Sequence, residues 1–247
     1  PDSRPPVKAR LDFANPSLSE LARRTIDSFP GETVAASGPA HLLLTDKTPN
    51  PPVDSSAKDG SEHLWMILFL SGEQKSAKAL FGPYILEKAH PLLEGVSLEG
   101  VRWAIPASSA QTPHDALPLI SCGDFPLLAE GSLQGSTKSF VLSYVPERSN
   151  LHSTSSWPVM MHNLVRMRAA ALPGFESRNC RAGEAAKGSF PNGKMLELAS
   201  VPGGMELPKI LPLSGASGAF EFISDETSLY DAKRSEERRV GKECRSR

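Results

Sequence analysis

The sequence predicts an α/β domain followed by a partial β-sandwich module, and three observations carry that prediction. Residues 64–70, LWMILFL, form the most hydrophobic run of the chain and have the length of a buried strand. Residues 139–174 combine a strand, a loop and an amphipathic helix, which is the repeating unit of layered α/β domains. Elsewhere, short β-prone runs alternate with turn residues. That spacing is typical of a wound sheet that ends in antiparallel edge strands.

The helix within residues 139–174 has clear signals at both ends. Ser155 and Ser156 are candidate caps, Pro158 suits a first turn, and Pro173-Gly174 ends the helix. Apolar side chains recur between these signals at the three- and four-residue spacings of one buried helix face: Trp157, Met160, Met161, Leu164 and Val165.

The amino-terminal part of the chain supplies one more helix and three strands. Residues 1–11 are expected to be a polar, proline-rich lead-in. A helix opens at Asn15-Pro16, as cap and first-turn proline, and ends at Pro30-Gly31. Residues 32–36 and 41–45 are predicted strands, residues 47–63 an exposed loop, and residues 64–70 the central strand.

The remaining strands are expected at residues 79–86, 101–105, 117–122, 125–130, 140–145, 194–201, 219–223 and 229–230. We place the α/β domain at residues 12–175. The partial β-module then covers residues 176–233, because its short strands are separated by glycine- and proline-containing turns.

The last fourteen residues, 234–247, are expected to be foreign to the fold. Their sequence, RSEERRVGKECRSR, resembles the translation of a widely used short-read sequencing adapter; the alternative is a solvated basic tail. Six of the 27 basic and three of the 28 acidic residues fall in this segment, so the rest has 21 basic and 25 acidic residues. Its net charge is therefore −4 instead of −1, which argues against a nucleic-acid-binding surface.

Cysteine content argues against a disulfide-rich or zinc-thiolate protein, and hydropathy argues against a membrane-spanning segment. Outside residues 234–247 the cysteines are Cys122 and Cys180, too few for a disulfide framework or a four-thiolate zinc site, although these two could pair. The longest apolar run is far shorter than the roughly 20 residues of a membrane-spanning helix, so we expect that this chain itself does not insert into a membrane. The chain opens on Pro1, and we expect it to be an internal fragment of a longer protein.

A family resemblance rests on a series of short motifs. They are HPLLEGVSLEGVRW at residues 90–103, LPLI at 117–120, residues 124–128, SNL at 149–151, WPV at 157–159 with Asn163-Leu164, and NCRAGE at 179–184. In these motifs, residues 12–230 resemble the carboxy-terminal half of the long aerotolerance-regulator-type bacterial membrane proteins. In that family a pair of membrane helices and a von Willebrand factor type A domain precede a class I glutamine amidotransferase-like domain. A small β-domain then leads to a last membrane helix.

The resemblance implies a flavodoxin-like, class I glutamine amidotransferase-like sheet in residues 12–175. It also implies a periplasmic or extracytoplasmic location, with the membrane anchors outside this chain. Protein partners within a membrane assembly linked to stress tolerance are implied, and no known reaction is.

Candidate catalytic residues do not fit an active amidotransferase. Such an enzyme needs a nucleophilic cysteine on a tight strand-to-helix turn, with a histidine and a carboxylate nearby. Cys122 is followed by another predicted strand, and Cys180 lies in the connection to the β-module. The six histidines show no zinc-binding spacing, and no glycine run forms a phosphate loop. We therefore predict no catalytic residue, no metal and no cofactor.

One polar cluster is a candidate ligand site. Glu147, Arg148, Ser149, Asn150 and His152 follow the predicted strand at 140–145 and precede the helix. Open α/β sheets bind ligands outside the carboxyl ends of their strands. The alternative is a connecting loop held by serine and asparagine turn bonds.

The sequence thus leaves two classes of function. The first is a non-catalytic interaction or scaffold module, with small-ligand binding by residues 147–152 as a variant. The second is a divergent amidotransferase-like hydrolase. A cysteine or serine near an oriented histidine would favour the hydrolase, whereas an exposed apolar patch would favour the interaction module.

Overall fold

A computed structural model describes residues 6–29, 33–34, 40–47, 65–72, 76–107, 116–131, 133, 138–172, 174–175, 183–189, 195–201, 209–214, 218–223 and 229–234. The chain divides into two compact units, one of residues 6–168 and one that begins at residue 169 and includes residues 1–5. The expected boundary after residue 175 therefore falls seven residues later than the division between the units.

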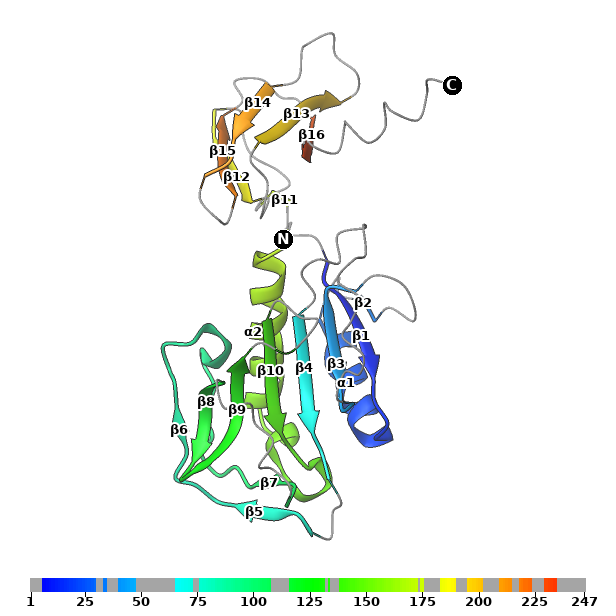
Figure 1. Ribbon diagram of the computed structural model, residues 1–247, viewed down its shortest axis with the longest axis vertical. Helices are drawn as coiled ribbons and strands as arrows, with labels where there is room; N and C mark the ends of the chain where they lie inside the picture. The colour runs from blue at the N-terminus through cyan, green and yellow to red at the C-terminus, as the bar shows by residue number, and fades with distance from the viewer. Residues whose placement is uncertain are drawn as a thin grey trace. The chain divides into compact units, whose positions relative to one another are not determined.

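An eight-stranded mixed sheet forms the first unit (Figure 1), which makes the predicted α/β class correct. Five strands run parallel in the spatial order β2-β1-β3-β4-β10, and antiparallel β9, β8 and β6 complete the sheet on the β10 side, as expected for antiparallel edge strands. In spatial order the bounds are Thr33–Val34, Lys8–Asp12, Leu42–Thr45, Trp65–Leu70, Lys138–Ser143, Phe125–Gly131, Leu117–Cys122 and Ile85–Leu86.

The predicted strands at residues 41–45, 64–70 and 140–145 are confirmed as β3, β4 and β10, and all three are buried. β4 lies between β3 and β10, and in each of the three strands at least four residues are buried. A strand with neighbours on both edges and cover on both faces needs an unbroken apolar sequence, which is why the hydrophobic run at residues 64–70 identified the centre of the sheet.

The lead-in predicted for residues 1–11 is wrong from residue 8 onward, because these residues contain most of β1 (Lys8–Asp12). β1 pairs in parallel with both β2 and β3, and Ala9 is 1% exposed. Only alternate residues of this strand enter the core, so Lys8 and Arg10 give the segment the polar composition of a loop. Its pairing partners lie more than twenty residues away, beyond the reach of a local pattern.

The strand predicted at residues 79–86 is two strands in different sheets. β5 (Lys78–Leu80) pairs with β7 (Trp103–Ile105) as a separate two-stranded sheet, and β6 joins the main sheet. Gly82 between them has φ = 81°, a conformation that side-chain-bearing residues rarely adopt, and Pro83 has no N–H to donate to a ladder. The Gly82-Pro83 peptide is cis.

The two helices of this unit lie on one face of the sheet (Figure 1). α1 (Pro16–Asp27) begins at the predicted Asn15 cap, and α2 (Ser156–Ala170) begins one residue after Ser155. The expected wound sheet would carry helices on both faces. In the described part of the chain the second face has no helix; there Leu133 packs against Ala40, Leu43 and Met66.

The Trp157 indole joins the two helices and the sheet. Its ring stacks on Tyr144 at 5.8 Å between centroids and lies 6.4 Å from the Phe69 ring of β4. Its Nε1–H donates to Thr25 Oγ1 of α1 at 2.8 Å. The side chain is 2% exposed, so the predicted apolar face of α2 is anchored by this residue.

Polar side chains of α2 hold the irregular segment of residues 92–102, which we call the strap. Asn163 Nδ2 donates to the Leu92 and Glu94 carbonyl oxygens at 3.2 and 2.7 Å. Ser156 Oγ accepts from the Ser97 N–H at 3.2 Å, and Arg166 forms an ion pair with Glu94. The strap is therefore fixed although it contains little regular structure.

The second unit contains two three-stranded antiparallel sheets. One consists of β11 (Gly174–Phe175), β12 (Ala185–Ser189) and β15 (Ala219–Ile223). The other consists of β14 (Lys209–Pro212), β13 (Met195–Val201) and β16 (Leu229–Arg234). Leu196 of β13 shares an apolar cluster with Phe220 and Phe222 of β15, which is the packing of the expected sandwich module.

The tail predicted to begin at residue 234 overlaps this unit by one residue. Arg234 is the last residue of β16 and pairs with Leu196, so the predicted lack of contact is wrong at this position. Residues 235–247 lie outside the described residues.

Replacing Trp157 by alanine should lower the free energy of unfolding by about 3–5 kcal/mol, because the substitution empties a packed site and leaves Thr25 without its donor. Urea unfolding followed by circular dichroism measures the change. Trp157→Phe is the matched control, since it keeps an aromatic ring and loses the indole N–H. A loss below about 1 kcal/mol for Trp157→Ala would contradict the anchoring role.

Candidate functional site

The order of the parallel strands singles out the carboxyl ends of β1 and β3. The chain passes from β1 to β2 on one side and then to β3 on the other, so the direction of winding reverses between β1 and β3. Open α/β sheets hold their ligands in the crevice at such a point. Residues 13–15 follow β1 there, and Asp46 and Lys47 follow β3.

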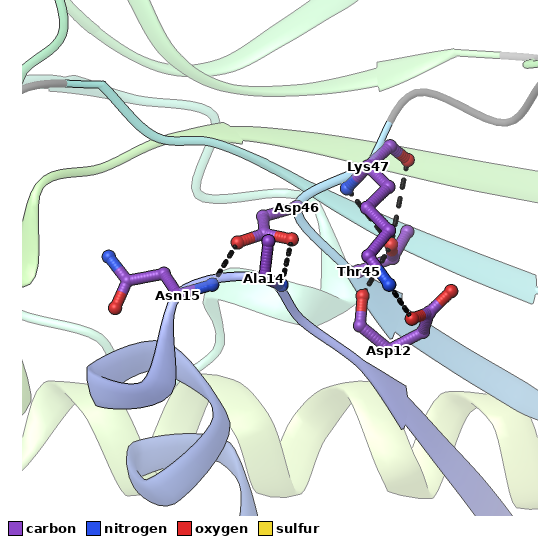
Figure 2. A network of polar contacts seen from close by, with 6 residues as sticks. All are labelled: Asp12, Ala14, Asn15, Thr45, Asp46 and Lys47. Carbon is purple, nitrogen blue, oxygen red and sulfur yellow. Dashed lines mark hydrogen bonds and ion pairs between the residues drawn. The ribbon is translucent and has the colours of Figure 1, made fainter.

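The Asp46 carboxylate binds the segment that leads into α1 (Figure 2). Its Oδ1 accepts from the Ala14 N–H at 2.7 Å, and its Oδ2 accepts from the Asn15 N–H at 2.8 Å. Asn15 Oδ1 in turn accepts from Ser17 N–H at 2.9 Å and Leu18 N–H at 3.4 Å, and Pro16 has no N–H. The backbone donors that would face an anionic ligand at this helix end are thus bonded to side chains of the chain itself.

The other polar groups at these strand ends are also paired. Thr45 Oγ1 donates to the Asp12 carbonyl at 2.8 Å and accepts from the Lys47 N–H at 3.0 Å. The Lys47 ammonium forms an ion pair with the Asp12 carboxylate (Figure 2). Both of these side chains are about half exposed, so the pair contributes little to stability and mainly neutralises the edge.

Three of the predicted ligand-site residues lie in two short 3₁₀ turns, Pro146–Arg148 and Leu151–Ser153, and Ser149 and Asn150 connect these turns. Ser149 is buried; its Oγ accepts from the Ala104 N–H at 2.9 Å and donates to the Val145 carbonyl at 2.7 Å. Asn150 Oδ1 accepts from the Arg102 N–H at 2.7 Å, and its Nδ2 donates to the Gly100 carbonyl at 3.2 Å. These two side chains tie the loop to the strap and to β7.

The other three members of that cluster are Glu147, Arg148 and His152. Glu147 and Arg148 are exposed. His152 Nδ1 is hydrogen-bonded at 2.7 Å to the hydroxyl of Tyr144, whose pKa is raised by burial, so the phenol stays protonated. The geometry favours the alternative of a connecting loop held by serine and asparagine bonds.

Cys122 lies in a β-hairpin. It pairs with Phe125 across the turn between β8 and β9, and the thiol is free and 9% exposed. Cys122 is followed by β9, as predicted from the sequence at residues 125–130. The strand-to-helix turn of an active amidotransferase is therefore not formed at Cys122. Cys180 lies outside the described residues.

A polar cluster that the sequence did not indicate lies at the opposite end of β10. Glu130 of β9 accepts from His90 Nε2 at 2.7 Å and pairs with the Lys138 ammonium at 2.8 Å. The ammonium lies 5.2 Å from the Trp65 ring and 5.6 Å from the Phe140 ring. His90 Nδ1 accepts from the Leu92 N–H at 3.2 Å, so both nitrogens of this imidazole are engaged and neither can act as a free base.

An open groove runs between β6 and the strap and encloses about 620 Å³. Tyr84, Leu86 and Lys88 line one wall, and residues 96–101 line the other. Phe81 and Ile85 at this edge are 73% and 66% exposed, whereas large apolar side chains are usually covered.

Two absences hold for the residues that the structure describes. They include no group of three or more histidine, cysteine, aspartate or glutamate side chains placed to bind a metal ion. Over the same ranges, no helix combines the length and the apolar character that a bilayer crossing requires.

The chain was compared with models of known protein families and with curated proteins. No model of a known protein family matches the chain, and no curated protein matches its sequence.

Sequence reasoning missed the network around Asp46 because it missed β1. Once residues 8–12 are known to form a strand, Asp12 is its last residue, and Asn15 and Asp46 lie shortly beyond the ends of β1 and β3. A signal was present, since Asp46 directly follows a short strand of three leucines and a threonine, and an aspartate at the start of a turn often binds backbone donors.

Replacing Asp46 by asparagine should lower the free energy of unfolding by about 1–2 kcal/mol, because an amide offers one acceptor oxygen to the two N–H groups of Ala14 and Asn15. Urea unfolding measures the effect. Asp27→Asn at the exposed end of α1 is the control and should change stability by less than about 0.5 kcal/mol. Equal stability of the two variants would show that the Asp46 bonds do not order the strand ends.

Proposed function

We propose that the chain contains a class I glutamine amidotransferase-like domain that serves as a non-catalytic interaction module. The strand order supports the fold, since β2-β1-β3-β4-β10 is the 2-1-3-4-5 order of flavodoxin-like sheets with β10 as fifth strand. The single face of helices departs from that pattern, and it is compatible with a divergent member.

The observation that carries the proposal is the position of the Asp46 carboxylate. At the reversal point of the sheet, where a flavodoxin-like enzyme or carrier would bind an anionic group, the two donors in front of α1 bond to Asp46. A phosphate or carboxylate ligand would have to displace a carboxylate that is covalently part of the chain. The geometry therefore favours a structural role for this edge.

The surroundings of Cys122 support the same proposal. In a β-hairpin Cys122 does not lie at the strand-to-helix turn that, in such enzymes, places a helix N-terminus beside the thiol and supplies backbone donors for an oxyanion. A hydrolase would need both, and one oxyanion donor alone typically lowers the barrier by roughly 3 kcal/mol.

We further propose a protein partner that contacts the β6 edge, in an extracytoplasmic assembly anchored to a bacterial membrane. Exposed Phe81 and Ile85 support a contact surface, because large exposed apolar side chains are enriched at protein interfaces. The membrane context and the link to stress tolerance rest on the motif resemblance to the aerotolerance-regulator-type proteins.

Photo-crosslinking from position 81 tests the partner surface. The chain, carrying a photoreactive phenylalanine analogue in place of Phe81, is incubated with a solubilised bacterial envelope; the captured protein is identified, purified and titrated by calorimetry. The double variant Phe81→Ala, Ile85→Ala should weaken its Kd at least about tenfold. Ile223→Ala is the control, because Ile223 is an exposed apolar residue (55%) in the second unit. Unchanged affinity of the double variant would reject this surface.

Thiol chemistry tests the non-catalytic assignment. Wild type and Cys122→Ala should hydrolyse glutamine no faster than buffer, and the Cys122 thiol should react slowly near neutral pH because it is buried. Alkylation rates and ammonia release measure the two quantities. Glutamine turnover that is present in wild type and lost in Cys122→Ala would instead support the hydrolase.

A further inference from the structure

His41 joins three strands and a helix at the amino-terminal end of the parallel strands. Its N–H donates to the Lys8 carbonyl of β1 at 2.8 Å. Its carbonyl accepts from the Trp65 N–H of β4 at 3.2 Å and from Arg168 Nε of α2 at 2.8 Å. Its imidazole Nδ1 accepts from the Lys8 N–H at 3.1 Å, so both backbone groups of Lys8 bond to one residue.

Among the residues that the structure describes, the charged side chains that act on this imidazole are cations. Lys8 faces it from β1 and Arg168 from α2. β4 contributes Trp65, which has the Arg168 guanidinium carbon at 5.5 Å and the Lys138 ammonium of β10 at 5.2 Å from its ring. A proton on His41 would therefore remove the acceptor for Lys8 and add a positive charge beside cations.

His90 provides the contrast within the same chain. Its Nδ1 also accepts a backbone N–H, from Leu92, but the Glu130 carboxylate lies 2.7 Å from its Nε2. His90 thus has an anionic side-chain partner, whereas the charged side chains named above for His41 are cations.

We propose that His41 is an acid-sensitive latch: its neutral imidazole holds the Lys8 N–H at the amino-terminal end of β1, and protonation of the imidazole releases that end of the strand. Burial, followed by Arg168 and Lys8, lowers the pKa of His41 below 6.5 in the folded chain, against a smaller opposing effect of a backbone hydrogen bond. The latch is thus fully closed above pH 6.5. Its contribution to stability is lost as the pH falls from 6.5 toward the lowered pKa, because the opened chain binds the proton more readily.

Nuclear magnetic resonance on the full chain tests the latch. The imidazole carbon shifts of His41 report its pKa, and amide hydrogen exchange, corrected for the intrinsic pH dependence, reports the protection of the Lys8 N–H between about pH 8 and about pH 5. We expect wild type to lose Lys8 protection over the range in which His41 titrates, at a midpoint below 6.5.

Two variants distinguish the effect of His41 protonation from a general destabilisation of the fold at low pH. In His41→Gln the side-chain amide oxygen can accept the Lys8 N–H and does not titrate, so Lys8 protection should stay constant. His162→Gln, at an exposed position of α2, should follow wild type. A wild-type His41 midpoint at or above 6.5, or equal loss of protection in His41→Gln, would overturn the proposal. If His41→Gln fails to fold, the wild-type comparison of midpoint and Lys8 protection decides alone.

Discussion

The contacts of Trp157 with both layers position most of the first unit. The indole lies on Tyr144 and near Phe69, and its N–H reaches Thr25, so the two helices and the central strands share one buried side chain. Because α2 is fixed in this way, its polar face can hold the strap through Ser156, Asn163 and Arg166. The strap is thus held by hydrogen bonds from α2, and α2 is itself held in place by the packing of Trp157.

The polar side chains at the carboxyl edge serve mostly as internal connectors. Asp46 satisfies the chain in front of α1, and Ser149 and Asn150 satisfy the strap and β7. Each bond uses an acceptor or donor that a ligand would need. A domain whose polar groups are bonded to one another in this way keeps the shape of an open α/β sheet, and these groups are no longer free to bind a ligand.

Local sequence signals predicted an element correctly where its own caps and the spacing of its own apolar residues determine its structure. Asn15-Pro16, Pro158 and the apolar face of α2 identified both helices, and the run in β4 identified the centre of the sheet. The signals failed where the partner is distant. β1 looks polar because Lys8 and Arg10 alternate with its buried side, and the Asp46 bonds span 31 and 32 residues. The five residues predicted as a ligand site were placed correctly at a strand end, but a sequence cannot reveal that Ser149 and Asn150 are bonded to the strap.

The pairing of β4 has a consequence for the order in which the chain is made. β4 acquires its first neighbour, β3, from residues already synthesised, but its other neighbour is β10, and Trp65 pairs with Lys138, 73 residues later in the sequence. Until β10 leaves the ribosome, the most apolar strand of the protein has one unpaired edge. Synthesis of the intervening residues is therefore the interval in which a chaperone, or another nascent chain, has access to the centre of the sheet.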